Sequence, residues 1–148
     1  MFEVLKKKKF QFGCLILSFV CICAFLFIGY RFGINYLDQE YLDQRIIFIL
    51  KNMTVLQVSI HLWVTMTLDV IFPIAYGFLF FGILLSNLEG QWKFLAVLPL
   101  ILIAVDLTEG IFQIQLLKAE TREMMIVSYK NKITLINYFL FLICMGMC

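Results

Sequence analysis

Long apolar stretches alternate with short polar segments along this sequence of 148 residues. A helix needs about 20 mostly apolar residues to cross a bilayer, because hydrocarbon offers no hydrogen-bond partners to free backbone groups. Four stretches reach or approach that length, at residues 12–30, 68–88, 92–117 and 133–148. The pattern therefore predicts one all-α transmembrane domain over residues 1–148, an integral membrane four-helix bundle.

The segment between the first two stretches mixes apolar and polar positions. Residues 46–68 are mostly apolar, but Lys51, Asn52, Gln57 and His61 interrupt them. Polar groups at the bilayer centre would each cost about 2–3 kcal/mol, which argues against a span here. We expect instead an interfacial helix between spans one and two that runs into the second span, with His61 near the interface. A fifth span is the alternative.

The composition agrees with a chain that is largely covered by lipid. Hydrophobic residues make up 63% and charged residues 15%, and the mean hydropathy is +0.96. A soluble domain of this size needs more polar surface. The net charge of +2 is too small to predict a nucleic-acid partner. The lipid bilayer is therefore the expected partner.

All five cysteines lie in the first and the last apolar stretches. They show neither C-x-x-C spacing nor a nearby histidine, so we expect no metal and no cofactor. In apolar helices cysteine behaves as a small hydrophobic residue, and palmitoylation of Cys14 or Cys148 is the alternative. We therefore expect the first and last stretches to form apolar walls.

Lysines at positions 6–9 precede the first stretch, and no small-residue cleavage site follows it. This arrangement indicates an uncleaved anchor, with the plasma or inner membrane as the expected location. The lysines favour a cytoplasmic N-terminus by the positive-inside rule. In this orientation four basic residues face outside, against the same rule: Lys118, Arg122, Lys130 and Lys132. We expect Lys130 and Lys132 to extend toward the membrane interface.

The second stretch carries polar and helix-shaping residues at helical spacing. Asp69, Pro73, Tyr76 and Gly77 share one face of a helix. Pro73 removes a backbone donor and frees a carbonyl about one turn earlier. A carboxyl group and a phenol therefore face the same side of this span.

The third stretch repeats this pattern with more carboxyl groups. Asp106, Glu109 and Gln113 stand at positions i, i+3 and i+7, again on one face. Gly110 lies beside them, and Pro99 precedes Asp106 by one heptad. We expect both prolines and both glycines of the two stretches to shape the helices around a polar pocket.

A tight turn at residues 89–91 should bring the two polar faces together. Counted outward from this turn, Asp69 falls level with Glu109. By the same count, Tyr76 falls near the level of Asp106. The expected network has Tyr76 donating its hydroxyl to Asp106 and Asp69 sharing a proton with Glu109.

Three carboxyl groups at such closeness cannot all be ionised without a cation. One of them is expected to be protonated, or to pair with Lys118, Arg122 or a bound ion. Two functions stay open for the pocket. It serves a binding, scaffold or accessory-subunit role, holding a lipid-like ligand or docking another membrane subunit. Alternatively, it is the site of an intramembrane enzyme or proton-linked carrier, although no nucleophile–base pair supports an enzyme.

Two paired motifs contain most of these residues, D-x-x-x-P-x-x-Y-G in the second stretch and P-x6-D-x-x-E in the third. They comprise Asp69, Pro73, Tyr76, Gly77, Pro99, Asp106 and Glu109. The pair resembles a group of small uncharacterised four-span bacterial membrane proteins, over about residues 60–115. In that group Asn commonly follows the second motif, where this chain has Gly110. The resemblance implies a four-helix membrane fold and no particular activity.

Overall fold

The computed structural model describes residues 2–37, 40, 42–118 and 124–148, and these contain helices and no strand. The helices are α1 (Phe2–Leu5), α2 (Lys8–Phe32), α3 (Asp43–Asn52), α4 (Val55–Asn87), the 3-10 helix η2 (Gly90–Val97), α5 (Leu98–Lys118) and α6 (Met124–Met147). The prediction of an all-α chain is therefore confirmed for the described residues.

Three helical segments of the described chain are long and apolar enough to cross a membrane. They are Lys8–Phe32, Val55–Asn87 and the continuous pair of η2 and α5, Gly90–Lys118. The prediction of a membrane protein with transmembrane helices is confirmed at this level. Helix α6 is not one of the three, because Lys130, Asn131 and Lys132 lower the hydropathy of its first half.

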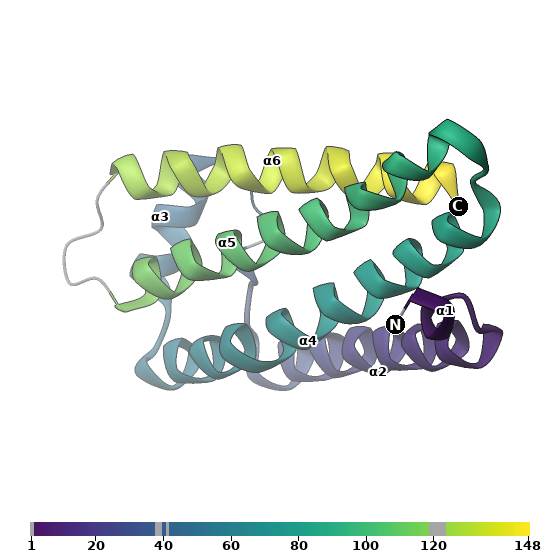
Figure 1. The fold of residues 1–148 in the computed structure, drawn as a ribbon. Coiled ribbons are helices and arrows are strands. Elements are labelled where there is room, and N and C mark those ends of the chain that lie inside the picture. The colour runs from purple at the N-terminus through teal and green to yellow at the C-terminus, as the bar shows by residue number, and fades with distance from the viewer. Residues whose placement is uncertain (1, 38–39, 41, 119–123) are drawn as a thin grey trace.

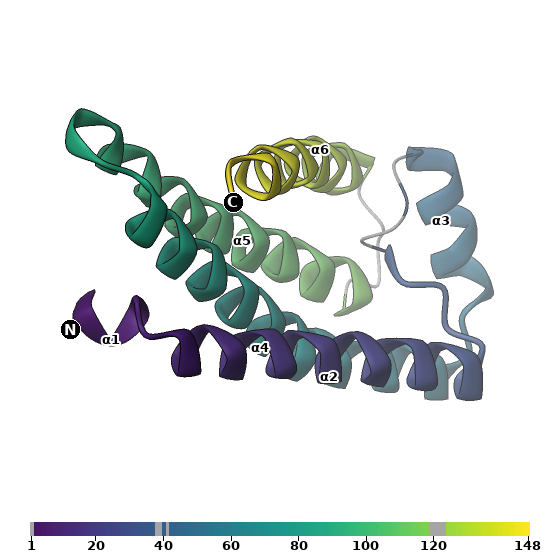
Figure 2. The same cartoon turned by 90° about the vertical axis from the view of Figure 1, so that its right-hand side faces the viewer.

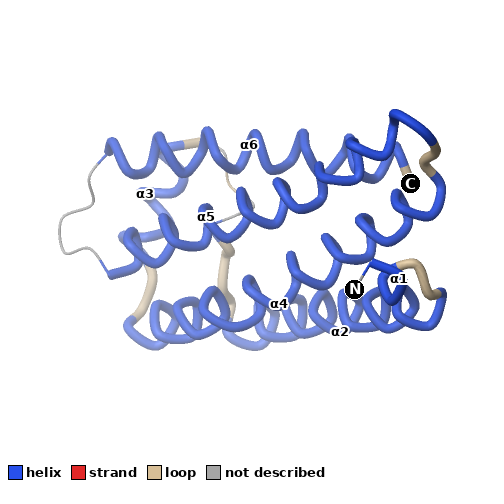
Figure 3. Tube along the Cα trace, viewed as in Figure 1, coloured by secondary structure: helices blue, strands red, loops and turns tan. Residues whose placement is uncertain are grey.

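The four long helices α2, α4, α5 and α6 run alternately in opposite directions (Figure 1). Both chain ends lie at the same end of the molecule as the turn between α4 and η2. The loops gather at the two ends, as the tube in Figure 3 shows. Helix α4 packs against α2 and α5, and α5 packs against α6. Figure 2 accordingly shows α2 and α6 on opposite sides of the α4–α5 pair.

The second predicted stretch, residues 68–88, is the later part of a longer helix that begins at Val55. Thr54 caps this helix, since its hydroxyl accepts from the backbone of Gln57 and the Gln57 side chain accepts from the Thr54 N–H. The Gln57 amide also donates to the carbonyls of Phe32 and Gly33 at the end of α2. Gln57, a polar residue that interrupts the apolar segment 46–68, therefore joins two helix ends.

Residues 46–68 do not form a separate span. The ten-residue helix α3 is only about 15 Å long at 1.5 Å per residue, half the thickness of the hydrocarbon core. It buries Ile46, Ile49 and Leu50. Residues 55–67 continue directly into the rest of α4.

Helix α6 begins at Met124, nine residues before the predicted start at position 133. Lys130 therefore lies within the helix, and its side chain is fully buried. The protein thus encloses this side chain, and the expectation that it extends toward the membrane interface stays a prediction. Lys132 is exposed, with its ammonium 5.7 Å from the ring centre of Tyr129.

Close packing of α4 on α5 depends on Gly77. A Cβ atom at this position would lie 2.3 Å from Cγ1 of Ile103 and 3.4 Å from the carbonyl oxygen of Pro99. Pro99 is the second residue of α5, and its missing N–H removes one backbone donor where η2 continues into α5. Pro73 lies inside α4, which changes direction between its level course beside α2 and its rise toward α5 (Figure 1).

Two apolar clusters occupy opposite ends of the molecule. Beside α3, the cluster includes Leu37, Ile46, Leu50, Leu116 and Val127. At the end with the chain termini, it comprises Leu5, Phe81, Leu84 and Ala96. The buried polar side chains of α5 and α6 lie between these clusters.

A candidate ligand cavity among α2, α4, α5 and α6

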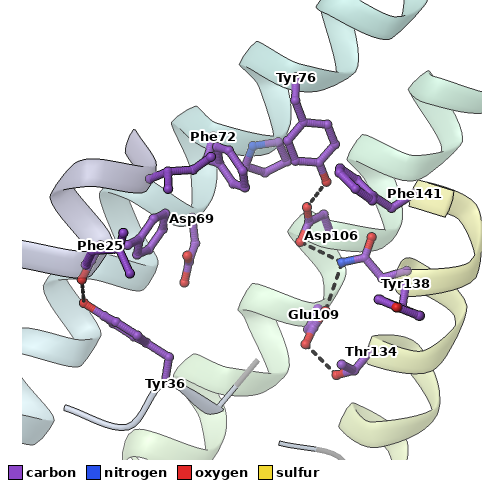
Figure 4. A pocket seen from close by; sticks show the side chains of 14 residues that line it. Phe25, Tyr36, Asp69, Phe72, Tyr76, Asp106, Glu109, Thr134, Tyr138 and Phe141 are labelled. Carbon is purple, nitrogen blue, oxygen red and sulfur yellow. Dashed lines mark hydrogen bonds between the residues drawn. The ribbon is translucent and has the colours of Figure 1, made fainter. Parts of the chain in front are cut away.

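A cavity of about 340 Å³ lies among the four long helices (Figure 4). Its polar lining consists of Asp69, Tyr76, Asp106, Glu109, Thr134 and Asn137. Helix α2 and the segment after it supply apolar and aromatic walls, including Phe25 and Tyr36. The pocket was expected between the second and third stretches alone, so the walls from α2 and α6 are an addition to that prediction.

The polar centre of the site joins α4, α5 and α6. The hydroxyl of Tyr76 donates to Oδ2 of Asp106, in agreement with the expected network. The Asn137 amide donates to Oδ1 of Asp106 at 2.9 Å and to Oε2 of Glu109 at 3.1 Å. The hydroxyl of Thr134 donates to Oε1 of Glu109 at 2.5 Å. Figure 4 shows these bonds along one side of the cavity.

Glu109 also forms a buried ion pair with a lysine of α6. Nζ of Lys130 lies 3.5 Å from Oε1 of Glu109, and both side chains are almost fully buried. The same ammonium donates to the carbonyls of Leu37 and Glu40. Buried charges persist when they are paired and hydrogen-bonded, and this pair meets both conditions.

The expected cationic partners of the carboxyl groups were different lysine and arginine residues. Lys118 is exposed at the end of α5, and Arg122 lies outside the described residues. The ion pair uses Lys130 because α6 lies alongside α5 in the opposite direction and turns this side chain inward.

Asp69 lines the cavity from α4. In Figure 4 its carboxyl group lies apart from the carboxyl group of Glu109. The hydrogen bonds described for Glu109 go to Thr134 and Asn137 of α6. The expected proton sharing between Asp69 and Glu109 stays a prediction, since equal depth in a hairpin does not by itself set the same direction around the helix axis.

Gln113 and Gly110 lie outside the cavity lining. Oε1 of Gln113 accepts from the Thr65 hydroxyl at 3.5 Å, so this buried amide joins α4 to α5. A Cβ atom at Gly110 would lie 3.8 Å from Cγ2 of Thr65, an ordinary contact. Four of the five candidate ligand or proton residues thus line the cavity, and Gln113 lies outside the lining, bonded to Thr65.

His61 is fully buried within the protein, and its position near the membrane interface stays a prediction. Its ring lies edge-on to Tyr36, with ring centres 5.5 Å apart. Neither ring nitrogen has a hydrogen-bond partner among the described residues. Tyr36 in turn donates its hydroxyl to the carbonyl of Phe25, which ties the segment after α2 to the cavity wall.

The contribution of α6 is the main feature that sequence reasoning missed. Its side chains in the site are Lys130, Thr134, Asn137, Tyr138 and Phe141. Lys130, Thr134 and Asn137 stand at positions i, i+4 and i+7, so they share one helix face. This polar face is a signal in the sequence that could have identified α6 as part of the site.

Comparisons with protein-family models, with curated proteins and with solved structures found no match to this chain. The class of this protein therefore follows from its fold and its site. It is a helical protein with three segments long and apolar enough to cross a membrane and with a cavity lined by carboxyl groups. Within the described residues, no group of three His, Cys, Asp or Glu side chains is arranged to hold a metal ion.

Proposed function

We propose that this is an integral membrane protein of four spans that binds an amphipathic, lipid-like molecule in the cavity. The spans are α2, α4, η2 with α5, and α6. Helix α6 supports a fourth span because its outward side chains are apolar, among them Leu135, Phe139 and Ile143. Its polar side chains Lys130 and Thr134 are buried against α5 instead.

The membrane placement follows from helix length. The 33 residues of α4 extend about 50 Å, which exceeds the hydrocarbon core by about 20 Å. Its first turns therefore project beyond the core beside α3, which acts as the interfacial helix. The other end of the molecule, away from α3, carries the exposed lysines at positions 6–9 and the exposed Lys93. By the positive-inside rule these lysines favour the cytoplasm for that end, in the plasma or inner membrane.

The observation that carries this proposal is the change from polar to apolar lining across the cavity. Asp106 and Glu109 contribute carboxyl groups on the α5 side. Ile22 and Leu26 contribute aliphatic side chains on the α2 side, and both are exposed on the outer surface of the molecule. A molecule with an apolar chain can therefore enter from the bilayer between α2 and α6 and place its polar head against α5.

A second candidate function rests on the continuous polar contacts of the site. They run from Tyr76 through Asp106, Asn137 and Glu109 to Lys130. Such a chain favours proton exchange, as in a proton-linked carrier or an intramembrane enzyme. Binding alone remains the first proposal, because the site offers no activated nucleophile. The resemblance to four-span bacterial proteins agrees with either function.

Photolabelling tests the binding proposal. The full-length protein in phosphatidylcholine nanodiscs is labelled with dodecanol that bears a diazirine on its first carbons. We expect labelled positions at Thr134 and Asn137, whose side chains line the cavity. Excess unlabelled dodecanol should remove this signal.

Two matched substitutions on α2 complete the test. Ile22→Trp narrows the cavity rim and should reduce labelling of α6 at least fivefold. Ile16→Trp adds the same ring to an equally exposed position outside the lining and should leave the labelling unchanged. Equal labelling in both variants, or no label inside the cavity, would contradict the proposal.

A further inference from the structure

The charged side chains that line the cavity all have the same sign. Asp69, Asp106 and Glu109 line it, and no basic side chain of the described residues does. Lys130 contacts Glu109 from behind the wall, with its ammonium turned toward the carbonyls of Leu37 and Glu40. The cavity therefore presents carboxyl groups to a ligand, while the one paired ammonium stays out of reach.

Three donor groups of the wall bond to its own carboxyl groups, and the hydroxyl of Tyr138 is a further donor among the lining residues. The Tyr76 hydroxyl and the Asn137 amide donate to Asp106, and the Thr134 hydroxyl donates to Glu109. Each carboxyl group has up to four acceptor positions, so both retain capacity to accept more bonds. The wall thus has a surplus of acceptors over donors.

Asn137 adds an independent observation to this surplus. Its Nδ2 atom donates to two carboxyl groups, which leaves Oδ1 as the acceptor end of the same amide. This oxygen is buried and has no hydrogen-bond partner among the described residues. A buried acceptor without a hydrogen bond is unfavourable, and a donor on a bound ligand would satisfy it.

We propose that the head group of the bound amphiphile is a primary ammonium. It carries three donors and one positive charge, which match the acceptor surplus and offset the excess of carboxyl groups in a low-dielectric site. A phosphate head would bring negative charge and further acceptors against the same wall. A neutral alcohol offers only one donor. This inference rests on the proposed function, since it specifies the ligand of the same cavity.

A competition experiment separates the three head groups. Protein in phosphatidylcholine nanodiscs is labelled with the diazirine-bearing dodecanol in the presence of dodecylamine, dodecanol or dodecyl phosphate. We expect dodecylamine to suppress labelling of Thr134 and Asn137 at a concentration at least tenfold lower than dodecanol does. Dodecyl phosphate should compete more weakly than dodecanol.

Carboxyl substitutions then test the cause of the preference. Asp106→Asn should reduce the advantage of dodecylamine over dodecanol to less than threefold. Asp69→Asn provides the same test if the first variant does not fold. Glu89→Gln removes an exposed carboxyl group at the α4–η2 turn and should leave the tenfold advantage intact.

The outcomes distinguish this inference from the proposed function. Equal competition by dodecylamine and dodecanol would overturn the ammonium head while the cavity still binds amphiphiles. Stronger competition by dodecyl phosphate would overturn it as well. If the cavity takes up no dodecanol label at all, the proposed binding function fails first.

Discussion

Helices α2 and α6 flank the cavity on opposite sides, but they bury different kinds of side chain. Helix α2 buries Ser18 and Cys21, and the Ser18 hydroxyl donates to a carbonyl of its own helix, that of Cys14, at 2.9 Å. Helix α6 buries Lys130 and Thr134, which contact Glu109 of α5. The buried hydroxyl of α2 bonds within its own helix, whereas the buried polar side chains of α6 also bond to the neighbouring helix α5.

The difference shows why overall hydropathy is an incomplete guide to the role of a membrane helix. Hydropathy averages all faces of a helix, but only the outward face contacts lipid. The polar residues of α6 stand on one face, which α5 covers. Helix α2 has no such face, so its side chains contribute an apolar wall. Both stretches were expected to be apolar walls, and that expectation is wrong for α6.

Among the changes that test this contrast, removal of the buried ammonium of α6 is expected to have the largest effect on stability. Lys130→Met leaves Glu109 buried without its ion-pair partner. We expect the free energy of unfolding in mixed micelles to fall by about 3–5 kcal/mol, the usual effect of breaking a buried pair. Chemical unfolding followed by helical circular dichroism measures this loss.

Two further variants identify its cause. Lys132→Met removes an exposed lysine from the same helix and should change stability by less than about 0.5 kcal/mol. Adding Glu109→Gln to Lys130→Met removes the uncompensated charge and should restore at least half of the lost stability. An equal loss in the Lys130 and Lys132 variants would show that the buried pair has no special role.

Asn137→Leu is expected to have the next largest effect. It removes both amide hydrogen bonds to the carboxyl groups of Asp106 and Glu109. Hydrogen bonds between membrane helices average about 0.6 kcal/mol each, so the expected loss is about 1–2 kcal/mol. The neighbouring Ile136→Leu, on the exposed face of α6, serves as the matched control in the same unfolding measurement. A loss no greater than that of the control would mean that the amide does not hold α5 to α6.

The contact between α4 and α5 could be predicted from the sequence because it depends on a short turn. Gly90 adopts a positive φ of 57° at the expected turn, and the two helices then run back alongside each other. Tyr76 and Asp106 lie at similar distances from this turn and on the facing sides. Their hydrogen bond therefore follows from spacing alone.

The contacts of α6 could not be predicted in the same way. The segment before α6 is longer than a tight turn, so counting residues from it gives no reliable depth. Pairing Lys130 with Glu109 also requires the rotation of α6 about its axis, which the neighbours decide through packing. The burial of His61 against Tyr36 likewise depends on packing between segments that are distant in the sequence. In each case the tertiary surroundings override the local pattern.

The smallest expected effect compares one hydroxyl on each helix. Ser18→Ala removes a bond within α2 and should change the free energy of unfolding by less than about 0.5 kcal/mol, because a Ser bond to its own i−4 carbonyl adds little to a helix. Thr134→Val removes the bond across to Glu109 together with the bond of the same hydroxyl to the Lys130 carbonyl of its own helix at 3.1 Å, and should cost about 1 kcal/mol. The difference is predicted to vanish when Glu109 is replaced by Leu, since the hydroxyl then has no carboxyl group to reach. A difference that persists in that background would mean that Thr134 stabilises α6 through its own helix, and the contrast between the two helices would lose its basis.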